Sequence, residues 1–550
     1  MQMQLDSRSR WKSVVLLFAV ATVAVPTPAD AAVLIGGISP SAVARSGRLI
    51  ISGTGFGTIQ GPGQVLVDGV PAPVTHWSDS AITAYILGST PLGSASLSIT
   101  NGVGESSSFP IEVLAREAAA DQVRWRFMTD ADAIPQRQAV GPDGSVYVQD
   151  LLGRLYALSA DGLLQWIFDT GGLAEGPIDV GADGTIYTSG NPAGPDVHIY
   201  AINPDGTEKW SFTDPGITQG VIAGPNVGPD GNIYVVTEAP GLGALSLTPD
   251  GDLRWSNQGE PQLFENGQLG LEIGFNAALG RMYVAFDELG MGGGPRLYSF
   301  SMSSGDQEFG VPSAFQAVTF TDPPYPTVGP DGKIYMNTGN ALRSFDPESG
   351  SMLWTAYPFT NGVLKPTIGA DGRIYTVRAL FTLTATNPSG STAWSMTDSG
   401  ILFAPVVSPD DASIVVGGRV NFGQPGFVKA FTTDGAPLWQ VDLPFEHGAN
   451  IIPSNRATFA ADGQTAYIGT SIPGQVPTNA YSYLYALQMN DAPPTAPFDL
   501  NADGMVDGAD LAFVLAAWGP CAACGDCPED FNGDCQVDGA DLAQVLANWG

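Results

Sequence analysis

The chain has 550 residues, of which 55 are acidic and 22 are basic, so its net charge is −33. A nucleic-acid-binding protein needs a basic surface, and this balance excludes that class. Glycine and proline, with 69 and 43 residues, make up about a fifth of the chain, while 44% of all residues are hydrophobic. This composition excludes long helical bundles, collagen and disorder, and it predicts a mainly β protein with many tight turns.

The N-terminal segment has the pattern of a secretory signal peptide. Arg8, Arg10 and Lys12 precede an apolar run at 14–25, and a stretch rich in small residues ends at Ala31. The apolar run is too short to cross a bilayer as a helix, and no later segment has the length that a span requires. We therefore expect a signal peptide over 1–31, a secreted or cell-surface protein, and no membrane span.

Residues 33–114 are expected to form a β-sandwich. Residues 65–70 (VLVDGV) alternate in polarity around an Asp68-Gly69 turn, which predicts a hairpin. Together with Ile38-Ser39-Pro40 and the run at 49–57 (LIISGTGFG), this hairpin resembles the IPT/TIG family. The resemblance implies an immunoglobulin-like sandwich that serves as a spacer or interaction module. We interpret His76 as an ordinary surface residue in a loop of this sandwich.

Residues 121–490 consist of repeated units. The first, "VGPDGSVYV" followed by "GRLYALSADGLLQW", ends at Trp166, and similar units recur along the segment. Each unit predicts three or four strands joined by Asp-Gly turns. One such unit cannot bury both of its faces alone, so successive units must pack into a closed β-propeller. Eight copies predict eight blades, with seven as the alternative if the weak unit near Tyr283 is an insertion.

The two ends of the repeated segment are expected to meet. "VRWRF" around Trp125 precedes the first unit, whereas the last unit, near Tyr467, has no outer tryptophan. We therefore predict that "VRWRF" supplies the outer strand of the last blade. The units resemble the PQQ-like, quinoprotein-type propeller, which also occurs in non-enzymatic outer-membrane assembly factors; residues 346–354 (DPESGSMLW) are the nearest copy of its outer-strand pattern. The resemblance implies that the tryptophans dock between neighbouring blades.

A proline-rich spacer at 491–497 leads into a duplicated motif within 498–550. "DLNADGMVDGAD" (499–510) and "DFNGDCQVDGAD" (530–541) place oxygen-bearing groups at positions 1, 3, 5, 7, 9 and 12 of a loop, the spacing that surrounds Ca²⁺ with oxygens. Two calcium sites are predicted. Their side-chain ligands are Asp499, Asn501, Asp503, Asp507 and Asp510, and Asp530, Asn532, Asp534, Asp538 and Asp541, with the carbonyls of Met505 and Gln536. Cys535 replaces glycine at position 6, which predicts a weaker or distorted second site.

The charge of this terminal segment supports a bound cation. From Pro497 onward the chain has ten acids and neither lysine nor arginine. Carboxylates about 4 Å apart repel by about 1 kcal/mol even in water, and by more when they are partly buried. Divalent ions would cancel this repulsion, so calcium binding is expected to be coupled to folding. A short amphipathic helix is expected after each loop, over 511–518 and 542–549.

The two loop-helix repeats resemble a dockerin domain, the module that cohesin domains bind. The resemblance implies a cohesin-like partner that contacts Gly508, Ala509, Gly539 and Ala540, identical pairs that would permit binding in two orientations. The four cysteines are Cys521, Cys524, Cys527 and Cys535. In an exported protein their even number predicts two disulfides, while the spacing alone also allows zinc or an iron–sulfur cluster, and the connectivity stays open.

Taken together, these features favour a secreted, non-catalytic binding or scaffold protein over an enzyme. The repeated segment has no cysteine and the chain has no C-x-x-C-H haem site, which argues against PQQ as a cofactor. No catalytic residue is assigned, and Glu446-His447 is interpreted as a surface loop. The alternatives are a dockerin-tethered polysaccharide-processing protein with a carbohydrate ligand and, third, a PQQ-dependent dehydrogenase.

Overall fold

The structure is a computed structural model. It describes residues 32–102, 104–116, 122–130, 138–172, 176–190, 198–213, 221–237, 243–258, 272–286, 296–312, 325–338, 341–358, 360, 363–421, 424–446, 449–454, 456–471, 482–489, 508–521, 527, 529–531 and 535–547. The expected signal peptide and the spacer at 491–497 lie outside these residues. None of the helices in the described part is long and apolar enough to cross a membrane.

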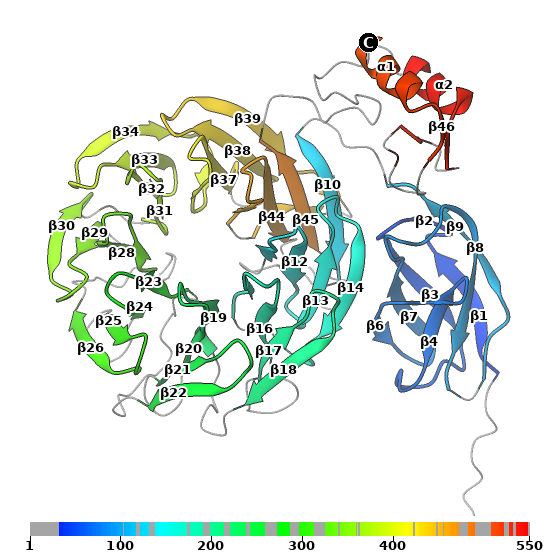
Figure 1. Cartoon of the computed structure of the whole chain (residues 1–550), viewed down its shortest axis with the longest axis horizontal. Helices are drawn as coiled ribbons and strands as arrows, with labels where there is room; N and C mark the ends of the chain where they lie inside the picture. The colour runs from blue at the N-terminus through cyan, green and yellow to red at the C-terminus, as the bar shows by residue number, and fades with distance from the viewer. Residues whose placement is uncertain are drawn as a thin grey trace, which may run out of the picture.

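Eight antiparallel sheets form a ring in the described part of the chain (Figure 1). The first three are β11 (Gln138–Val140), β12 (Val146–Gln149), β13 (Arg154–Leu158) and β14 (Leu164–Asp169); β15 (Asp179–Val180), β16 (Ile186–Gly190), β17 (His198–Ile202) and β18 (Glu208–Thr213); and β19 (Val221–Val227), β20 (Ile233–Thr237), β21 (Gly243–Leu247) and β22 (Leu253–Gln258). The next three are β23 (Gly274–Asn276), β24 (Arg281–Phe286), β25 (Arg296–Ser301) and β26 (Gln307–Pro312); β27 (Thr327–Val328), β28 (Ile334–Asn337), β29 (Leu342–Phe345) and β30 (Met352–Ala356); and β31 (Thr367–Ile368), β32 (Ile374–Arg378), β33 (Thr382–Thr386) and β34 (Thr392–Thr397).

The seventh and eighth sheets complete the ring. The seventh has β35 (Ile401–Leu402), β36 (Val406–Val407), β37 (Ser413–Arg419), β38 (Gly426–Thr432) and β39 (Pro437–Asp442). The eighth has β42 (Ile452–Pro453), β43 (Thr458–Phe459), β44 (Thr465–Ser471) and β45 (Ser482–Gln488), while the pair β40 (Phe445–Glu446) and β41 (Ala449–Asn450) lies between them in the chain. The weak unit near Tyr283 supplies the whole fourth sheet and is no insertion.

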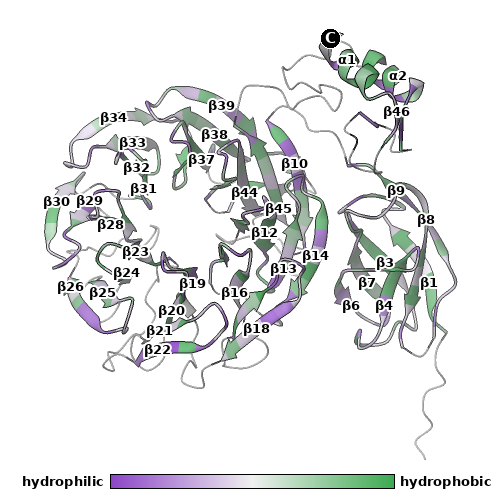
Figure 2. Ribbon diagram, in the orientation of Figure 1, coloured by the Kyte–Doolittle hydropathy of each residue, from purple (hydrophilic) through white to green (hydrophobic). Residues whose placement is uncertain are grey.

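Burial explains why each repeat forms this kind of sheet. The second and third strands, such as β12 and β13, are buried along almost their whole length, because neighbouring sheets cover both of their faces. Outer strands such as β18 and β26 have only half-buried and exposed positions, and Figure 2 shows hydrophilic residues on both. The Asp-Gly turns end in glycines with positive φ, for example 82° at Gly144, which lets two residues join adjacent strands.

The ring is closed by a strand from the opposite end of the repeated segment. β10 (Val123–Thr129) pairs antiparallel with β45, with Trp125 opposite Ala486 and Thr129 opposite Ser482. This is the closure that the sequence predicts. It covers the outer edge of β45 with a strand from the other end of the repeated segment, and an uncovered edge there would be open to pairing with other chains.

An aromatic residue of each outer strand docks onto the next sheet. The Trp166 indole donates a hydrogen bond to the carbonyl of Pro204 at 2.9 Å and covers Gly206, where a Cβ would lie 2.6 Å from the indole. Equivalent indole hydrogen bonds to the next sheet come from Trp125, Trp210, Trp255, Trp354, Trp394 and Trp439. The expected docking of the tryptophans between blades is confirmed. At the fourth sheet Phe309 covers Gly350 instead, and it has no N–H to donate.

The N-terminal residues form two sheets around one core. One sheet has β1 (Leu34–Ser39), β3 (Arg48–Thr54), β7 (Ala81–Tyr85) and β6 (Val74–Trp77), and the other has β2 (Ala42–Ala44), β9 (Phe109–Leu114), β8 (Gly93–Thr100), β4 (Gln64–Val67) and β5 (Val70–Ala72). Buried residues of both sheets, such as Ile51 and Val65, belong to the same cluster. The predicted hairpin is present, and both Asp68 and Gly69 have positive φ.

This two-sheet unit is joined to the ring at its closure. Tyr85 is fully buried and packs with Phe127 of β10 and Tyr156 of β13, with ring centroids 5.8 Å away in both cases. Gly88 and Ser46 hydrogen-bond the backbone of Leu164. The two-sheet unit therefore contacts both the eighth and the first sheet where they meet. The sequence analysis expected this unit to be a spacer or interaction module.

Buried charges surround this contact. Asp130 pairs with Arg48 of the two-sheet unit and lies 3.6 Å from the Arg154 guanidinium, and Arg154 also lies 3.9 Å from Asp150. The Tyr85 hydroxyl donates to Asp130 at 3.1 Å, and the Tyr156 hydroxyl donates to Asp150 at 2.9 Å. Burial raises the pKa of Asp150 to about 6, although Arg154 opposes that effect.

Removing the Tyr85 side chain should loosen the closure. We expect Tyr85→Ala to lower the free energy of unfolding by about 3–5 kcal/mol, because it leaves a cavity among aromatic rings and removes a donor from a buried carboxylate. Urea unfolding followed by tryptophan fluorescence measures the change. Ile59→Ala, at a side chain that is 76% exposed, is the control and should have no effect. Equal stability of Tyr85→Ala and the unchanged protein would show that the two-sheet unit is an independent spacer.

Asp150 should make stability depend on pH. Its pKa lies above the ordinary 3.8, so the folded protein binds this proton more tightly than the unfolded chain does. Stability should therefore fall as the pH rises from about 4 to about 6, by up to about 3 kcal/mol from this group. Unfolding free energies of the unchanged protein and Asp150→Asn, measured between pH 4 and pH 7, should diverge over this interval. Parallel curves would show that the carboxyl has no raised pKa.

Candidate functional site

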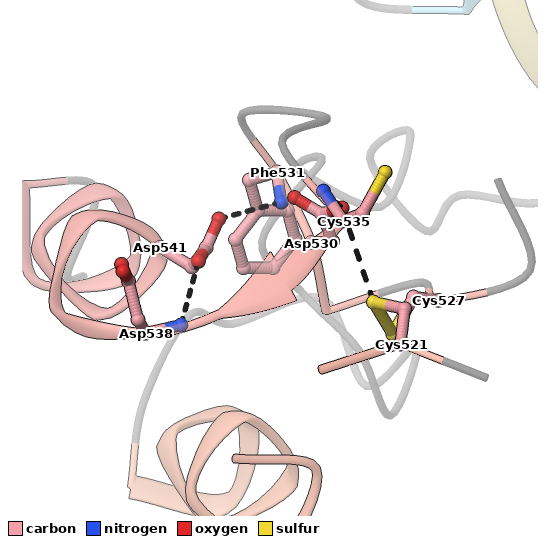
Figure 3. Close-up of a disulfide and its surroundings, with 7 residues drawn as sticks. All are labelled: Cys521, Cys527, Asp530, Phe531, Cys535, Asp538 and Asp541. Carbon is pink, nitrogen blue, oxygen red and sulfur yellow. Dashed lines mark hydrogen bonds between the residues drawn. A yellow bond between two sulfur atoms is a disulfide. The ribbon is translucent and has the colours of Figure 1, made fainter. Parts of the chain in front are cut away.

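The second predicted calcium loop is organised around Asp541. This residue lies in the first turn of α2 (Gly539–Ala547) and is fully buried. Its Oδ1 accepts the N–H of Phe531 at 2.9 Å, and its Oδ2 accepts the N–H of Asp538 at 2.9 Å (Figure 3). The carboxylate at position 12 thus holds the backbone at positions 2 and 9 of the loop, which brings the loop back onto the helix.

Both helices begin earlier than the sequence analysis expected. α1 spans Gly508–Ala516 and α2 spans Gly539–Ala547, three residues ahead of the expected starts. At α2 the reason is a cap, because the Asp538 carboxylate accepts the N–H of Ala540 at 2.7 Å. The last predicted ligand, Asp541, therefore lies within the helix and is positioned by it.

The middle of the second loop turns at Cys535. Its φ of 71° lies in the left-handed region, which is the conformation expected of glycine at position 6. The Asp530 carboxylate accepts the Cys535 N–H at 2.8 Å, and the Cys535 carbonyl accepts the N–H of Cys521 at 3.0 Å. β47 (Gln536–Val537) then pairs with β46 (Gly519–Pro520). The cysteine adopts the turn that glycine would make, with the strain that a Cβ adds there.

The cysteines of this segment form disulfides. Cys521 is bonded to Cys527, and Cys535 is also disulfide-bonded, while Cys524 lies outside the described residues (Figure 3). A sulfur atom in a disulfide is not the thiolate that zinc or an iron–sulfur cluster requires. The disulfide interpretation is therefore the correct one of those that the spacing allowed. The Cys521–Cys527 bond lies within the connection between the two predicted loops.

The first loop is described only at its end. Asp510 is fully buried in the first turn of α1, as Asp541 is in α2. The other predicted ligands of this loop, and two of the second, lie outside the described residues: Asp499, Asn501, Asp503, Met505, Asp507, Asn532 and Asp534. Gly508, Gly539 and Ala540 are exposed at the helix starts. In the described residues no three His, Cys, Asp or Glu side chains are grouped closely enough to hold a metal ion.

A second cluster of charges lies inside the ring, and the sequence analysis missed it. Glu272, just before β23, pairs with Lys365, just before β31, and lies 3.8 Å from Arg456, just before β43. Lys365 is buried and lies 4.5 Å from the centre of the Tyr325 ring. Burial acts to raise the pKa of Glu272, but the two cations outweigh it and hold this pKa below its ordinary value. The only signal in the sequence was that basic residues are rare in this chain, so that a lysine just before an inner strand is unusual.

These ion pairs join sheets that are not neighbours. Glu272 belongs to the fourth sheet, Lys365 to the sixth and Arg456 to the eighth. Each of the three residues lies two positions before a short strand, β23, β31 or β43. β23 and β31 lie toward the centre of the ring (Figure 1), so the pairs link the fourth, sixth and eighth sheets across its interior.

Two residues that were interpreted as surface loops have defined places. His76 is exposed but lies within β6, between the two sandwich strand residues Thr75 and Trp77. Glu446 accepts hydrogen bonds from Arg126 of β10 at 2.6 Å and from the Tyr483 hydroxyl of β45 at 3.0 Å. It therefore helps to hold the closing strand, and its neighbour His447 lies outside the described residues.

Several solved structures resemble this chain weakly. BamB from Moraxella catarrhalis is 13% identical, with a TM-score of 0.46 over 67% of this chain and 100% of that chain. Quinohemoprotein alcohol dehydrogenase from Comamonas testosteroni is 12% identical, with a TM-score of 0.46 over 68% and 78%. Quinohemoprotein alcohol dehydrogenase ADHIIG from Pseudomonas putida HK5 is 12% identical, with a TM-score of 0.46 over 66% and 76%. No curated protein matches the chain.

One family model matches the chain over residues 112–269 and 311–471. Its description is outer membrane protein assembly factor BamB, and the matched residues fall on the ring of sheets and its closing strand. The expected likeness to PQQ-like propellers is thereby confirmed for this part. Since more than half of the 550 residues are matched, the protein belongs to the PQQ_2 family of BamB-like β-propellers.

Proposed function

We propose that this protein is a secreted, non-catalytic binding scaffold whose C-terminal loops bind calcium and attach it to an extracellular partner. The observation that carries the proposal is the buried Asp541 carboxylate, which organises its loop through two backbone hydrogen bonds. Asp510 is buried at the equivalent place in the first repeat. No lysine or arginine follows Pro497, so the segment has no basic side chain of its own to neutralise these carboxylates.

A bound cation accounts for this arrangement better than a solvated acidic tail. Buried ionised groups need a partner of opposite charge or a metal, since their transfer from water is costly. Oxygen ligands at loop positions 1, 3, 5, 7, 9 and 12 suit Ca²⁺, and the disulfides hold the two repeats in a compact segment.

Exposed apolar side chains favour a protein partner for this segment. Phe513 and Leu515 of α1, Trp518 just after it and Leu546 of α2 are about half exposed. Apolar side chains gathered on a small acidic module are typical of interaction surfaces. The exposed helix starts at Gly508, Gly539 and Ala540 lie beside them in the sequence, which supports a cohesin-like domain as the partner.

Calcium binding can be tested on the full chain by calorimetric titration. We expect two binding events in the unchanged protein and one in either Asp510→Asn or Asp541→Asn. Each substitution should weaken its own site by at least about tenfold, because it removes a charged ligand and the charge that draws the ion into the loop. Asp143→Asn, in an Asp-Gly turn of the first sheet, is the matched control and should keep both events. An unchanged titration in the double variant would refute the calcium sites.

The attachment is tested separately with an immobilised cohesin domain. The calcium-loaded chain should bind, and EGTA should release it. Ala509→Glu combined with Ala540→Glu should abolish capture while both calcium events persist, since charge is added at both partner faces outside the ligand positions. Capture in EGTA, or an unaffected double variant, would contradict the proposed partner surface.

A further inference from the structure

The first turn of the seventh sheet departs from the repeat. In the other seven sheets, the turn between the first two strands ends in a glycine with positive φ: Gly144, Gly184, Gly231, Gly280, Gly332, Gly372 and Gly463. In the seventh sheet Asp411 takes this position, with a φ of 57°. Its N–H still donates to the carbonyl of Ser408 at 2.9 Å, so the turn itself is kept. A residue with a Cβ is strained in this conformation, and such strain often marks a functional site.

The Asp411 carboxylate lacks a donor. Its Oδ1 is buried without a hydrogen-bond partner in the described part of the chain. The carboxylate lies against Gly369 of the sixth sheet, where a Cβ would collide with Oδ1. Glycine at 369 therefore leaves the space that this oxygen occupies. A buried acceptor without a donor is costly, so folding alone does not favour a carboxylate at this position.

A cavity lies next to Asp411. It has a volume of about 470 Å³ and lies between β31, β36 and β43, which belong to three successive sheets. Asp411 lines it together with the apolar side chains of Ile368, Val407 and Phe459. This volume is in the range of small-molecule sites, which combine apolar walls with a few polar anchors.

Among the described residues that line the cavity, Asp411 is the one charged side chain. Lys365 and Arg456 precede two of the lining strands, but they do not line the cavity and they pair with Glu272. Asp371 Oδ1 would lie 3.1 Å from a Cβ at Gly369, on the same side as Asp411. Arg373 pairs with the other oxygen of Asp371 at 3.2 Å, whereas no ion pair to Asp411 exists among the described residues. The net charge of −33 adds to this local field.

We propose that this cavity binds an organic cation whose ammonium group pairs with Asp411 and whose apolar stem fills the space between the three strands. The site is independent of the C-terminal loops and of calcium. It gives the ring a ligand of its own, and it accounts for an aspartate at a turn position where every other sheet has glycine.

Hexylamine and hexan-1-ol are suitable probes, because they share an apolar stem and differ in charge. In calorimetry with the full chain, we expect hexylamine to bind at least about tenfold more tightly than the alcohol. Asp411→Asn, which keeps the shape of the side chain, should reduce hexylamine affinity to that of the alcohol. Asp411→Gly should do the same and also raise the Tm, because it restores the usual turn residue. Asp205→Asn, in an exposed turn of the second sheet, is the control and should keep the preference.

Three results would overturn the proposal. They are equal affinity of the unchanged protein for the two probes, hexylamine affinity retained in Asp411→Gly, and a lowered Tm in that variant. The last would show that Asp411 stabilises the turn and is not held there at a cost. Both variants keep the backbone hydrogen bond of the turn, so folding should not limit the test.

Discussion

The ring depends on one contact that recurs at its seams, an aromatic side chain of one outer strand against a glycine turn of the next sheet. A sheet with two apolar faces is stable only between neighbours, so the contact between sheets decides whether the ring forms. The indole covers the turn because glycine has no Cβ, and its N–H donates to a carbonyl of that turn, as Trp166 does to Pro204. Phe309 keeps the packing against Gly350 but cannot form the hydrogen bond, so packing is the part of the contact that every such turn retains.

Closing the ring imposes a further constraint, because its last sheet combines strands more than 300 residues apart. Bringing β10 to β45 costs loop-closure entropy, which the contacts at this seam must offset. The N-terminal unit adds contacts at this seam that the strands of the ring alone would not provide. Tyr85 adds a buried ring from the N-terminal unit, and Arg48 adds a charge to Asp130, which already lies near Arg154. The N-terminal unit is therefore part of the ring's closure, and its own stability and that of the seam are linked.

Features of the structure that repeat could be predicted from the sequence, whereas features that occur once could not. Period, turn residues and tryptophan spacing predicted the sheets, the closure by "VRWRF" and the docking of the indoles, because each signal occurs many times. The hairpin at Asp68-Gly69 was predictable from two residues that both tolerate positive φ. Contacts between distant segments left no pattern: nothing near Glu272 indicates Lys365 and Arg456, and nothing near Tyr85 indicates Phe127. The second loop was predicted as a calcium site from its spacing, whereas the roles of Asp541 and Asp538 in hydrogen bonding could be seen only in the structure.

In a repeat protein the exceptions are informative, because packing explains what all copies share. Three exceptions differ in kind here. Phe309 packs against a turn glycine of the next sheet as the tryptophans do, but its ring has no N–H to donate a hydrogen bond. Cys535 accepts a positive φ and is disulfide-bonded, so a covalent bond accompanies the strain. Asp411 also accepts a positive φ, but its buried Oδ1 has no hydrogen-bond partner in the described part of the chain, and the residue lines a cavity. Glycine at that position would stabilise the turn more than aspartate does. We therefore attribute the aspartate to the ligand proposed for the cavity.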